Sequence, residues 1–365
     1  MMKKNIKIFV IAGEVSGDVL GAKIMRSLPS ARFAGIGGQH MRGAGLKPLF
    51  PISDLAVMGI FEVLARARTL TRRINETAAA IEKFQPDIVL TIDAPGFAKR
   101  VVKKVRRVSG AAPRFYHVVA PQVWAWRPRR AKKFAKIFDR LYAFFDFEVP
   151  YFTKYGLKTI PVGHPVADGL SPTAGAETNT IALIPGSRMS EAKKLLPVFM
   201  QVANRLGGRY KFYIPVVETT KKYIERETKN WPTRPVLVPA AKRYELFAKT
   251  GIAVAASGTV SAELAMMHVP AVVVYKMNPL TTLFARLLIR TKWVSLVNIL
   301  MKKTVYPELL GRKASVKNIV REVRRLENPA ARARMVSELS KADRMWRRGR
   351  PAAKIIAEDI MGGMM

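Results

Sequence analysis

Cysteine is absent from the 365 residues of this chain, and the absence removes several kinds of site at once. A disulfide framework, a thiolate metal centre, an iron–sulfur cluster and a cysteine nucleophile are all excluded. Histidine is also scarce, with four in the whole chain. So few histidines argue against a dedicated zinc site, and no metal or other cofactor is expected.

Acidic residues and long apolar runs are scarce as well. Asp and Glu total 26 against 63 Lys and Arg, which gives a formal net charge of +37. A surplus of this size predicts an anionic partner, such as phosphate, acidic lipid or nucleic acid, without choosing among them. No run reaches the roughly 18 uncharged apolar residues that span a bilayer. The apolar run at the N-terminus is split by Lys7, so we interpret it as a strand rather than a signal peptide and expect a cytoplasmic protein.

Short apolar runs bounded by glycine or proline alternate with helical patterns along the first half of the chain. The predicted strands are Ile6–Ala12, Arg32–Ile36, Ile88–Ile92, Phe115–Val119 and Leu141–Phe145. Strands that alternate with helices favour a parallel sheet covered on both faces.

The same alternation begins again after a loop rich in small residues, 168–178. Strands are predicted at Thr180–Ile184, Lys211–Pro215, Val236–Val238, Ile252–Ala256 and Ala271–Tyr275. From about Ser315 the chain is helical and basic. The fold class is therefore α/β, with two doubly wound Rossmann-like domains facing a cleft (1–168 and 169–314) and a helical basic C-terminal region (315–365).

Three small-residue turns join a predicted strand to a predicted helix. They are GEVSGD (13–18), PGSR (185–188) and SGT (257–259). Backbone N–H groups at such turns can hold a phosphate, but a plain turn, or helix capping by Ser187 and Ser257, uses the same groups. Both interpretations stay open on spacing alone. Glu263, about one turn into the helix after the third turn, could accept hydrogen bonds from a ribose.

Asp93 ends an apolar strand, at the edge of a sheet where a general base would stand. Its alternative role is to cap the following helix. The stretch after it, from Lys99 to Arg140, is strongly basic and includes Tyr116, Trp124 and Trp126. Basic residues with aromatics can bind single-stranded nucleic acid, although a solvated basic helix face is the commoner explanation.

Segment 57–73 places apolar side chains beside four arginines. Such a segment can lie in a bilayer interface, where arginine meets lipid phosphate; a helix packed on the core is the alternative. The sequence contains no Asp-x-Asp metal clamp for a sugar nucleotide. A transferase that neutralises its leaving diphosphate with arginine and helix N-termini remains open.

Nine segments in a fixed order resemble the lipid-A-disaccharide synthase family, from about Lys7 to Leu310. They are AGEVSGD (12–18), LAVMGIFEVL (55–64), IDAPGF (92–97), VWAWRPRR (123–130), VGHP (162–165), IPGSR (184–188), ASGTVSAEL (256–264), YKMNPLT (275–281) and VSLVNIL (294–300). The resemblance implies a GT-B glycosyltransferase that inverts the anomeric centre without a metal. The reaction it implies joins the sugar of UDP-2,3-diacylglucosamine to 2,3-diacylglucosamine 1-phosphate through a β(1→6) bond.

The resemblance also implies roles for particular residues. Asp93 matches the family's proposed base, whereas the family's usual second aspartate is replaced here by Gly96. The donor side matches Gly186, Ser187, Arg188, Ser257, Gly258, Thr259, Glu263, Tyr275, Met277 and Asn298. The acceptor side matches Glu14, Ser16, Gly17 and Asp18. The lipid-facing side matches Val57, Met58, Ile60, Phe61, Leu64, Arg66 and Arg68.

Location and partners follow from the same resemblance. It implies a peripheral protein on the inner face of the inner membrane that meets anionic lipid, and it raises a homodimer through the C-terminal region as an option. No nucleic-acid partner is expected. Two alternatives remain: a soluble GT-B-type sugar-nucleotide enzyme such as a UDP-N-acetylglucosamine 2-epimerase, and a nucleic-acid-binding protein, which would leave the phosphate turns and Asp93 without a use.

Overall fold

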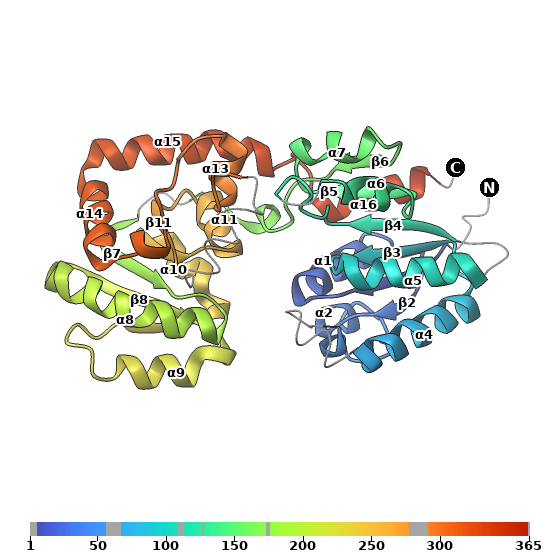
Figure 1. Cartoon of the computed structure of the whole chain (residues 1–365), viewed down its shortest axis with the longest axis horizontal. Coiled ribbons are helices and arrows are strands. Elements are labelled where there is room, and N and C mark those ends of the chain that lie inside the picture. Colours follow the sequence, from blue (N-terminus) through green and yellow to red (C-terminus); the bar gives the residue numbers. More distant parts are fainter. Residues whose placement is uncertain are drawn as a thin grey trace. The chain divides into compact units, whose positions relative to one another are not determined.

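A computed structural model describes residues 6–55, 67–108, 113–125, 128–172, 176–276 and 291–363. The chain divides into two compact units (Figure 1). Unit 1 comprises Met1–Asp168 together with Arg348–Met365, and unit 2 comprises Gly169–Arg347. The region 315–365 is therefore divided between the units rather than forming a body of its own.

Unit 1 is built on a parallel sheet of six strands among the described residues, in the order β2-β1-β3-β4-β5-β6. The strands are β1 (Lys7–Ala12), β2 (Arg32–Ile36), β3 (Ile88–Ile92), β4 (Arg114–Val118), β5 (Arg140–Ala143) and β6 (Lys158–Pro161). The first five confirm the predicted strands to within two residues at each end. The sixth has one fully buried residue in four, so its sequence carries no strand pattern.

Helices cover both faces of this sheet. They are α1 (Val15–Arg26), α2 (Gln39–Arg42), α4 (Ala67–Phe84), α5 (Pro95–Val108), α6 (Arg130–Ala135), α7 (Pro150–Thr153) and α16 (Ala352–Gly362). Alternate side chains of a strand point to opposite faces. Phe9 and Ile11 pack with α4, α5, α6 and α7, whereas Ile8 and Val10 pack with α1 and α16. Figure 1 shows α4 and α5 side by side on one face.

Helix α16 returns from the C-terminus to complete unit 1. Its Ile356 and Ile360 are fully buried in the core that α1 also covers. Asp359 accepts hydrogen bonds from the Tyr142 hydroxyl at 2.8 Å and from Arg140 Nη1 at 2.5 Å. The last helix therefore stabilises the sheet at β5.

Unit 2 has its own parallel sheet, with six strands in the described ranges in the order β12-β11-β10-β7-β8-β9. They are β7 (Glu177–Ile184), β8 (Lys211–Val216), β9 (Val236–Pro239), β10 (Thr250–Ala256), β11 (Ala271–Tyr275) and β12 (Glu308–Leu310). The five predicted strands of this half are confirmed. Strand β12 has three residues, too few to show a periodicity.

The helices of unit 2 pack on this sheet and on one another. They are α8 (Met189–Leu206), α9 (Glu218–Thr228), α10 (Arg243–Lys249), α11 (Thr259–Met266), α13 (Leu296–Met301), α14 (Val316–Glu327) and α15 (Pro329–Trp346). Figure 1 shows α8 beside α9, and these two helices are in contact. Helix α14 packs against α8, while α15 packs against α11 and α13.

Candidate active site

Each sheet has one place where successive connections leave in opposite directions. In unit 1 the chain goes from β1 outward to β2 and then returns to β3 on the other side of β1. In unit 2 it goes from β7 outward to β8 and β9 and then returns to β10 on the other side of β7. Loops separate at such switch points, and open α/β sheets bind ligands there, at the carboxyl ends of the strands.

The switch point of unit 1 carries Asp93, directly after β3. Its backbone N–H donates to the Val118 carbonyl at 3.0 Å, which extends the sheet by one residue. Asp93 has φ of 56°, Ala94 has φ of 44° and Val119, after the neighbouring strand, has φ of 80°. Positive φ is uncommon for residues other than glycine; aspartate tolerates it better than alanine does, and the β-branched valine tolerates it least. Strained positions of this kind cluster at functional sites.

The Asp93 carboxyl group is half-buried and lacks an ionic partner among the described residues. Burial raises its pKa, and a hydrogen bond from the Ala94 N–H to Oδ1, at 2.8 Å, acts in the opposite direction. The bond to Ala94 is local and does not engage the N-terminus of α5 further along the chain. A partly exposed carboxylate of raised basicity at a ligand-binding edge has the properties of a general base.

The loop after β1 lies against the loop that carries Asp93. The Gly13 N–H donates to the Ile92 carbonyl at 3.2 Å, and a Cβ on Gly17 would be 3.4 Å from the Ile92 side chain. Glu14 is half-buried and Ser16 is exposed. The structure therefore brings Glu14, Ser16 and Gly17 to the same edge as Asp93.

Asp18 has a different role from the one predicted for it. Its side chain is 2% exposed and accepts three backbone N–H bonds, from Gly38 at 2.7 Å, His40 at 2.9 Å and Met41 at 3.0 Å. These donors belong to the start of α2, whose first-turn N–H groups would otherwise be unsatisfied. Asp18 therefore stabilises α2 and joins α1 to it, and we do not keep it among the acceptor-side residues.

The switch point of unit 2 carries the two predicted phosphate turns. The turn after β7 passes through Gly186, with φ of 97°, and enters α8. The turn after β10 passes through Gly258, with φ of 155°, and enters α11. The N-cap residues are Arg188 and Gly258, and neither helix has a side-chain cap. Capping by Ser187 and Ser257 is therefore wrong, and the first-turn N–H groups are not occupied by a side-chain cap.

Arg188 stands at the entry of α8 with its side chain 57% exposed. Nη1 lies 3.2 Å from Oε1 of Glu191. Glu191 also leaves no room for a side chain at position 186, because a Cβ on Gly186 would be 2.3 Å from Glu191 Oε2. An exposed guanidinium next to a helix N-terminus is suited to a diphosphate.

Glu263 in α11 is held by a partner that the sequence did not suggest. Arg243 donates from Nε to Oε2 at 2.9 Å and from Nη2 to Oε1 at 3.3 Å, and it also donates to the Tyr244 hydroxyl at 2.7 Å. Glu263 is 7% exposed. The two residues lie 20 apart with no motif between them, so only the fold reveals the pair. Arg243 is a positioning residue for this carboxylate.

Asn298 also differs from expectation. Its amide donates to the Tyr306 carbonyl and to Glu308 Oε1, both at 2.8 Å, and its oxygen accepts from the N–H groups of Val305 and Tyr306. All four hydrogen-bonding positions are occupied and the residue is fully buried. Asn298 holds the segment before β12 in place, so we do not keep it among the donor-contacting residues.

The other predicted positions are placed only in part. Tyr275 ends β11 and is half-buried. Met277, Val57, Met58, Ile60, Phe61, Leu64 and Arg66 lie outside the described residues. Arg68 lies in the first turn of α4 and is exposed.

The aromatic residues of the basic stretch 99–140, considered above as possible platforms for single-stranded nucleic acid, are placed only in part. Tyr116 is 1% exposed, and the Trp124 indole N–H donates to Glu148 at 3.3 Å. Trp126 lies outside the described residues. Stacked bases need exposed rings, so Tyr116 is too buried to serve, whereas Trp124 is half-buried.

Two further features are absent from the parts of the chain that the structure describes. No described helix is long and apolar enough to cross a membrane. No three His, Asp or Glu side chains come together there as a potential metal site.

Two parallel α/β units, each with predicted site residues at its switch point, form a GT-B-like fold. Solved structures agree on the fold. An S. aureus MnaA–UDP co-structure has a TM-score of 0.67 at 12% identity and covers 98% of this chain and 97% of that one. A UDP-GlcNAc 2-epimerase from Neisseria meningitidis has a TM-score of 0.62 at 13% identity and covers 98% and 100%. Identities this low establish the fold alone.

Sequence comparison is more specific. The profile of the lipid-A-disaccharide synthetase family matches residues 8–356. The lipid-A-disaccharide synthase of Rhodospirillum centenum is 39% identical, over 98% of this chain and 94% of its own length. That of Gluconobacter oxydans is 41% identical, over 87% and 81%. The chain belongs to the lipid-A-disaccharide synthetase family and is a glycosyltransferase, which confirms the resemblance drawn from the nine segments.

Proposed function

We propose that the chain transfers a diacylglucosaminyl group from UDP-2,3-diacylglucosamine to 2,3-diacylglucosamine 1-phosphate. The products are the β(1→6)-linked disaccharide 1-phosphate and UDP. The observation that carries the proposal is Asp93: a half-buried carboxyl group of raised pKa, on a backbone of positive φ, at the switch point of unit 1.

The reaction is a single displacement. Asp93 removes the proton of the acceptor's 6-hydroxyl as that oxygen attacks the anomeric carbon. The bond from this carbon to the UDP oxygen breaks, and its electron pair leaves with UDP. Attack opposite the leaving group inverts the anomeric centre. General-base assistance of this kind contributes roughly 10²–10⁴ in rate.

Unit 2 takes the nucleotide part of the donor. Support comes from two helix N-termini without side-chain caps, those of α8 and α11, and from the exposed guanidinium of Arg188. Together they can neutralise the charge that develops on the leaving diphosphate. Glu263, held by Arg243, is suited to accept hydrogen bonds from the ribose hydroxyls. No metal is required by this scheme.

Acceptor and membrane contacts belong to unit 1. Glu14 and Ser16 lie at the same edge as Asp93 and are suited to the acceptor sugar. The apolar and arginine-rich segment 57–70 is proposed to lie in the bilayer interface, on the inner face of the inner membrane. The large positive net charge favours anionic lipid.

A homodimer through the C-terminal region also remains a proposal. Helix α16 packs on unit 1 through Asp359, which contacts Arg140 and Tyr142. An exchanged helix would make the same contacts with a partner chain. Light scattering behind a sizing column would give twice the chain mass if dimers form and 40.7 kDa if they do not.

One assay tests the function against its alternatives. The chain is incubated in neutral detergent micelles with UDP-diacylglucosamine and diacylglucosamine 1-phosphate, and mass spectrometry follows the disaccharide and UDP. A parallel arm supplies UDP-N-acetylglucosamine alone. Disaccharide in the first arm and no epimer in the second are expected. Epimer without disaccharide would support the soluble epimerase instead.

A further inference from the structure

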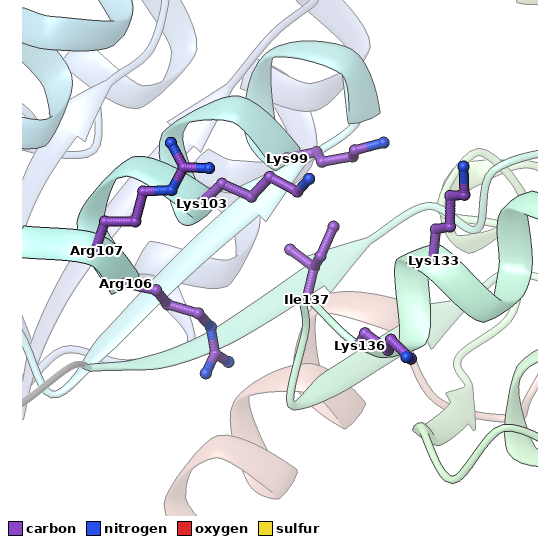
Figure 2. Close-up of a pocket in the computed structure, with 7 residues that line it drawn as sticks. All are labelled: Lys99, Lys103, Arg106, Arg107, Lys133, Lys136 and Ile137. Carbon is purple, nitrogen blue, oxygen red and sulfur yellow. The ribbon is translucent and has the colours of Figure 1, made fainter.

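A groove on unit 1, outside the site described above, is lined by positive side chains. It has a volume of about 380 Å³ and is lined by Lys99, Lys103, Arg106, Arg107, Lys133, Lys136 and Ile137. Figure 2 shows the four cationic residues of α5 on one side of Ile137, with Lys133 and Lys136 on the other. Helix α5 and the segment 133–137, which runs from α6 toward β5, thus bring positive side chains to the same groove.

Most of this charge is not neutralised within the protein. Arg106 pairs with Asp139 at 2.9 Å and lies over the Phe115 ring. None of the other five cations forms an ion pair with a described residue. Burial, followed by the positive charges of Lys103, Arg130, Lys133 and Arg100, lowers the pKa of Lys99. Like charges held this close create a potential that favours a bound anion.

The groove suits a compact anion attached to an apolar body. Ile137 is 6% exposed and forms an apolar floor between the charged groups. Lysine and arginine stems add apolar surface beneath their charged ends. A single strand of nucleic acid would instead be held by aromatic platforms, and the groove lining contains none. The combination favours a lipid phosphate over single-stranded nucleic acid.

The groove runs along α5 between the two edges of the sheet: Lys99 lies near the start of the helix, at the carboxyl edge, whereas Arg106 pairs with Asp139 just before β5, at the amino edge. Helices α4 and α5 pack side by side, and Lys104 Nζ donates to Asn75 Oδ1 at 2.5 Å between them. Both helices begin at the carboxyl edge of the sheet, since α4 leads into β3 and α5 leads out of it. Segment 57–66 joins α4 at Ala67, with Arg68 exposed in the next turn. Lys99 therefore lies on the helix that adjoins the end of the proposed membrane segment.

We propose that the groove between α5 and α6 binds the phosphate of anionic lipid headgroups. It acts as a second membrane contact on the unit whose chain includes segment 57–66, and it carries the lipid selectivity, while the apolar segment supplies insertion. The inference rests on the proposed membrane association and assigns it to named residues.

The test measures partition of the full chain onto vesicles of phosphatidylcholine with and without phosphatidylglycerol. The groove variant is Lys99→Gln/Lys103→Gln/Lys133→Gln. The matched control is Lys211→Gln/Lys229→Gln/Lys249→Gln, which removes equal charge from exposed lysines of unit 2. Because each lysine at an anionic surface contributes about 1 kcal/mol, the groove variant should lose roughly 10- to 100-fold in partition onto anionic vesicles. The control should lose less than about threefold.

Further arms distinguish the sources of the anion. Inorganic phosphate should release the protein no better than chloride at equal ionic strength; stronger release would indicate a free-phosphate site and overturn the proposal. Equal losses in both variants, or tighter binding of duplex DNA that the groove variant abolishes, would also overturn it.

Disaccharide synthesis in neutral micelles should be unchanged in the groove variant. A raised acceptor KM there would place the groove in the substrate site, whereas loss of synthesis by the unaltered chain would count against the proposed function alone.

Discussion

Gly13 packs against Ala94 so closely that no side chain fits at position 13. An ideal Cβ on Gly13 would be 2.1 Å from the Cβ of Ala94, well inside van der Waals contact. The loop after β1 thus packs directly on the loop that carries Asp93, and the missing side chain at position 13 permits it. The position of the proposed base depends on this approach.

Gly13→Ala should therefore displace the Asp93–Ala94 turn. Because Ala94 already has a positive φ, the turn has little freedom to move, and overpacking of this kind costs about 1–3 kcal/mol. We expect turnover to fall at least tenfold while UDP affinity is unchanged. The control is Gly169→Ala, where a Cβ meets nothing within 4 Å. Wild-type turnover in Gly13→Ala would show that the contact does not position the base.

Glu148 predicts a pH-dependent stability. It is 4% exposed in the turn 146–148, and burial raises its pKa to about 7 despite hydrogen bonds from Trp124 and the Phe145 N–H. In the unfolded chain a glutamate has a pKa of about 4.3. Between these values the folded protein keeps a proton that the unfolded chain releases. The free energy of unfolding should therefore fall as pH rises through this window and level off above it.

Glu148→Gln tests this expectation, because the amide has no proton to release. From pH 5 to pH 8 the variant should gain on the order of 2–3 kcal/mol relative to the unaltered chain. Urea unfolding followed by circular dichroism measures the difference. Glu82→Gln, at an exposed position of α4, should give no gain. Parallel stability curves for all three proteins would mean that Glu148 titrates normally.

Arg243 offers a prediction for the donor side. Arg243→Met leaves Glu263, at 7% exposure, without its bidentate partner. Removing one partner of a buried ion pair costs about 3–5 kcal/mol, so both stability and UDP affinity should fall. Arg243→Lys keeps the charge and should recover part of each. The control is Arg226→Met, whose side chain is 72% exposed. Unchanged UDP affinity in Arg243→Met would show that Glu263 does not contribute to nucleotide binding.

The Arg188 side chain should contribute to UDP affinity and not to the free energy of unfolding. Its side chain is 57% exposed, so Arg188→Ala should leave unfolding nearly unchanged. Loss of a charged hydrogen bond to the diphosphate should weaken UDP binding by about 1.5–3 kcal/mol. Calorimetry with UDP measures this, with Arg209→Ala, 69% exposed, as the control. Equal affinities for the two variants would refute the assignment.

The sequence predicted the fold well because buried parallel strands are continuous apolar runs, as in Ile88–Ile92, where every residue is buried. It missed β6, which has the sequence Lys-Thr-Ile-Pro, and β12, which has three residues and begins with a glutamate, because neither contains an apolar run. The ends of the predicted strands also identified the positions of Asp93, the turn after Gly13 and the two phosphate turns. The loop that follows each parallel strand emerges at the carboxyl edge of the sheet, where ligands bind.

Side-chain partners are what sequence reasoning could not supply. Asp18 and Asn298 are polar residues in motifs, and nothing local says that their hydrogen bonds go to backbone 20 to 23 and 7 to 8 residues away. The pairing of Arg243 with Glu263 spans 20 residues for the same reason. The motifs therefore identified the loops that carry candidate site residues. Only the fold distinguishes residues that are placed to contact a ligand from residues whose side chains hold a loop in place.

The most direct test of the account is the pH dependence of kcat/KM for disaccharide synthesis, measured for the unaltered chain and for Asp93→Asn. Because burial raises the pKa of Asp93 and the base must be ionised, activity should fall with acidification at a pH above the usual range for aspartate. The variant should lose roughly 10²–10⁴-fold and the acid limb with it, while its UDP affinity is unchanged. An Asp93→Asn protein that binds UDP normally and turns over at the unaltered rate would contradict the mechanism.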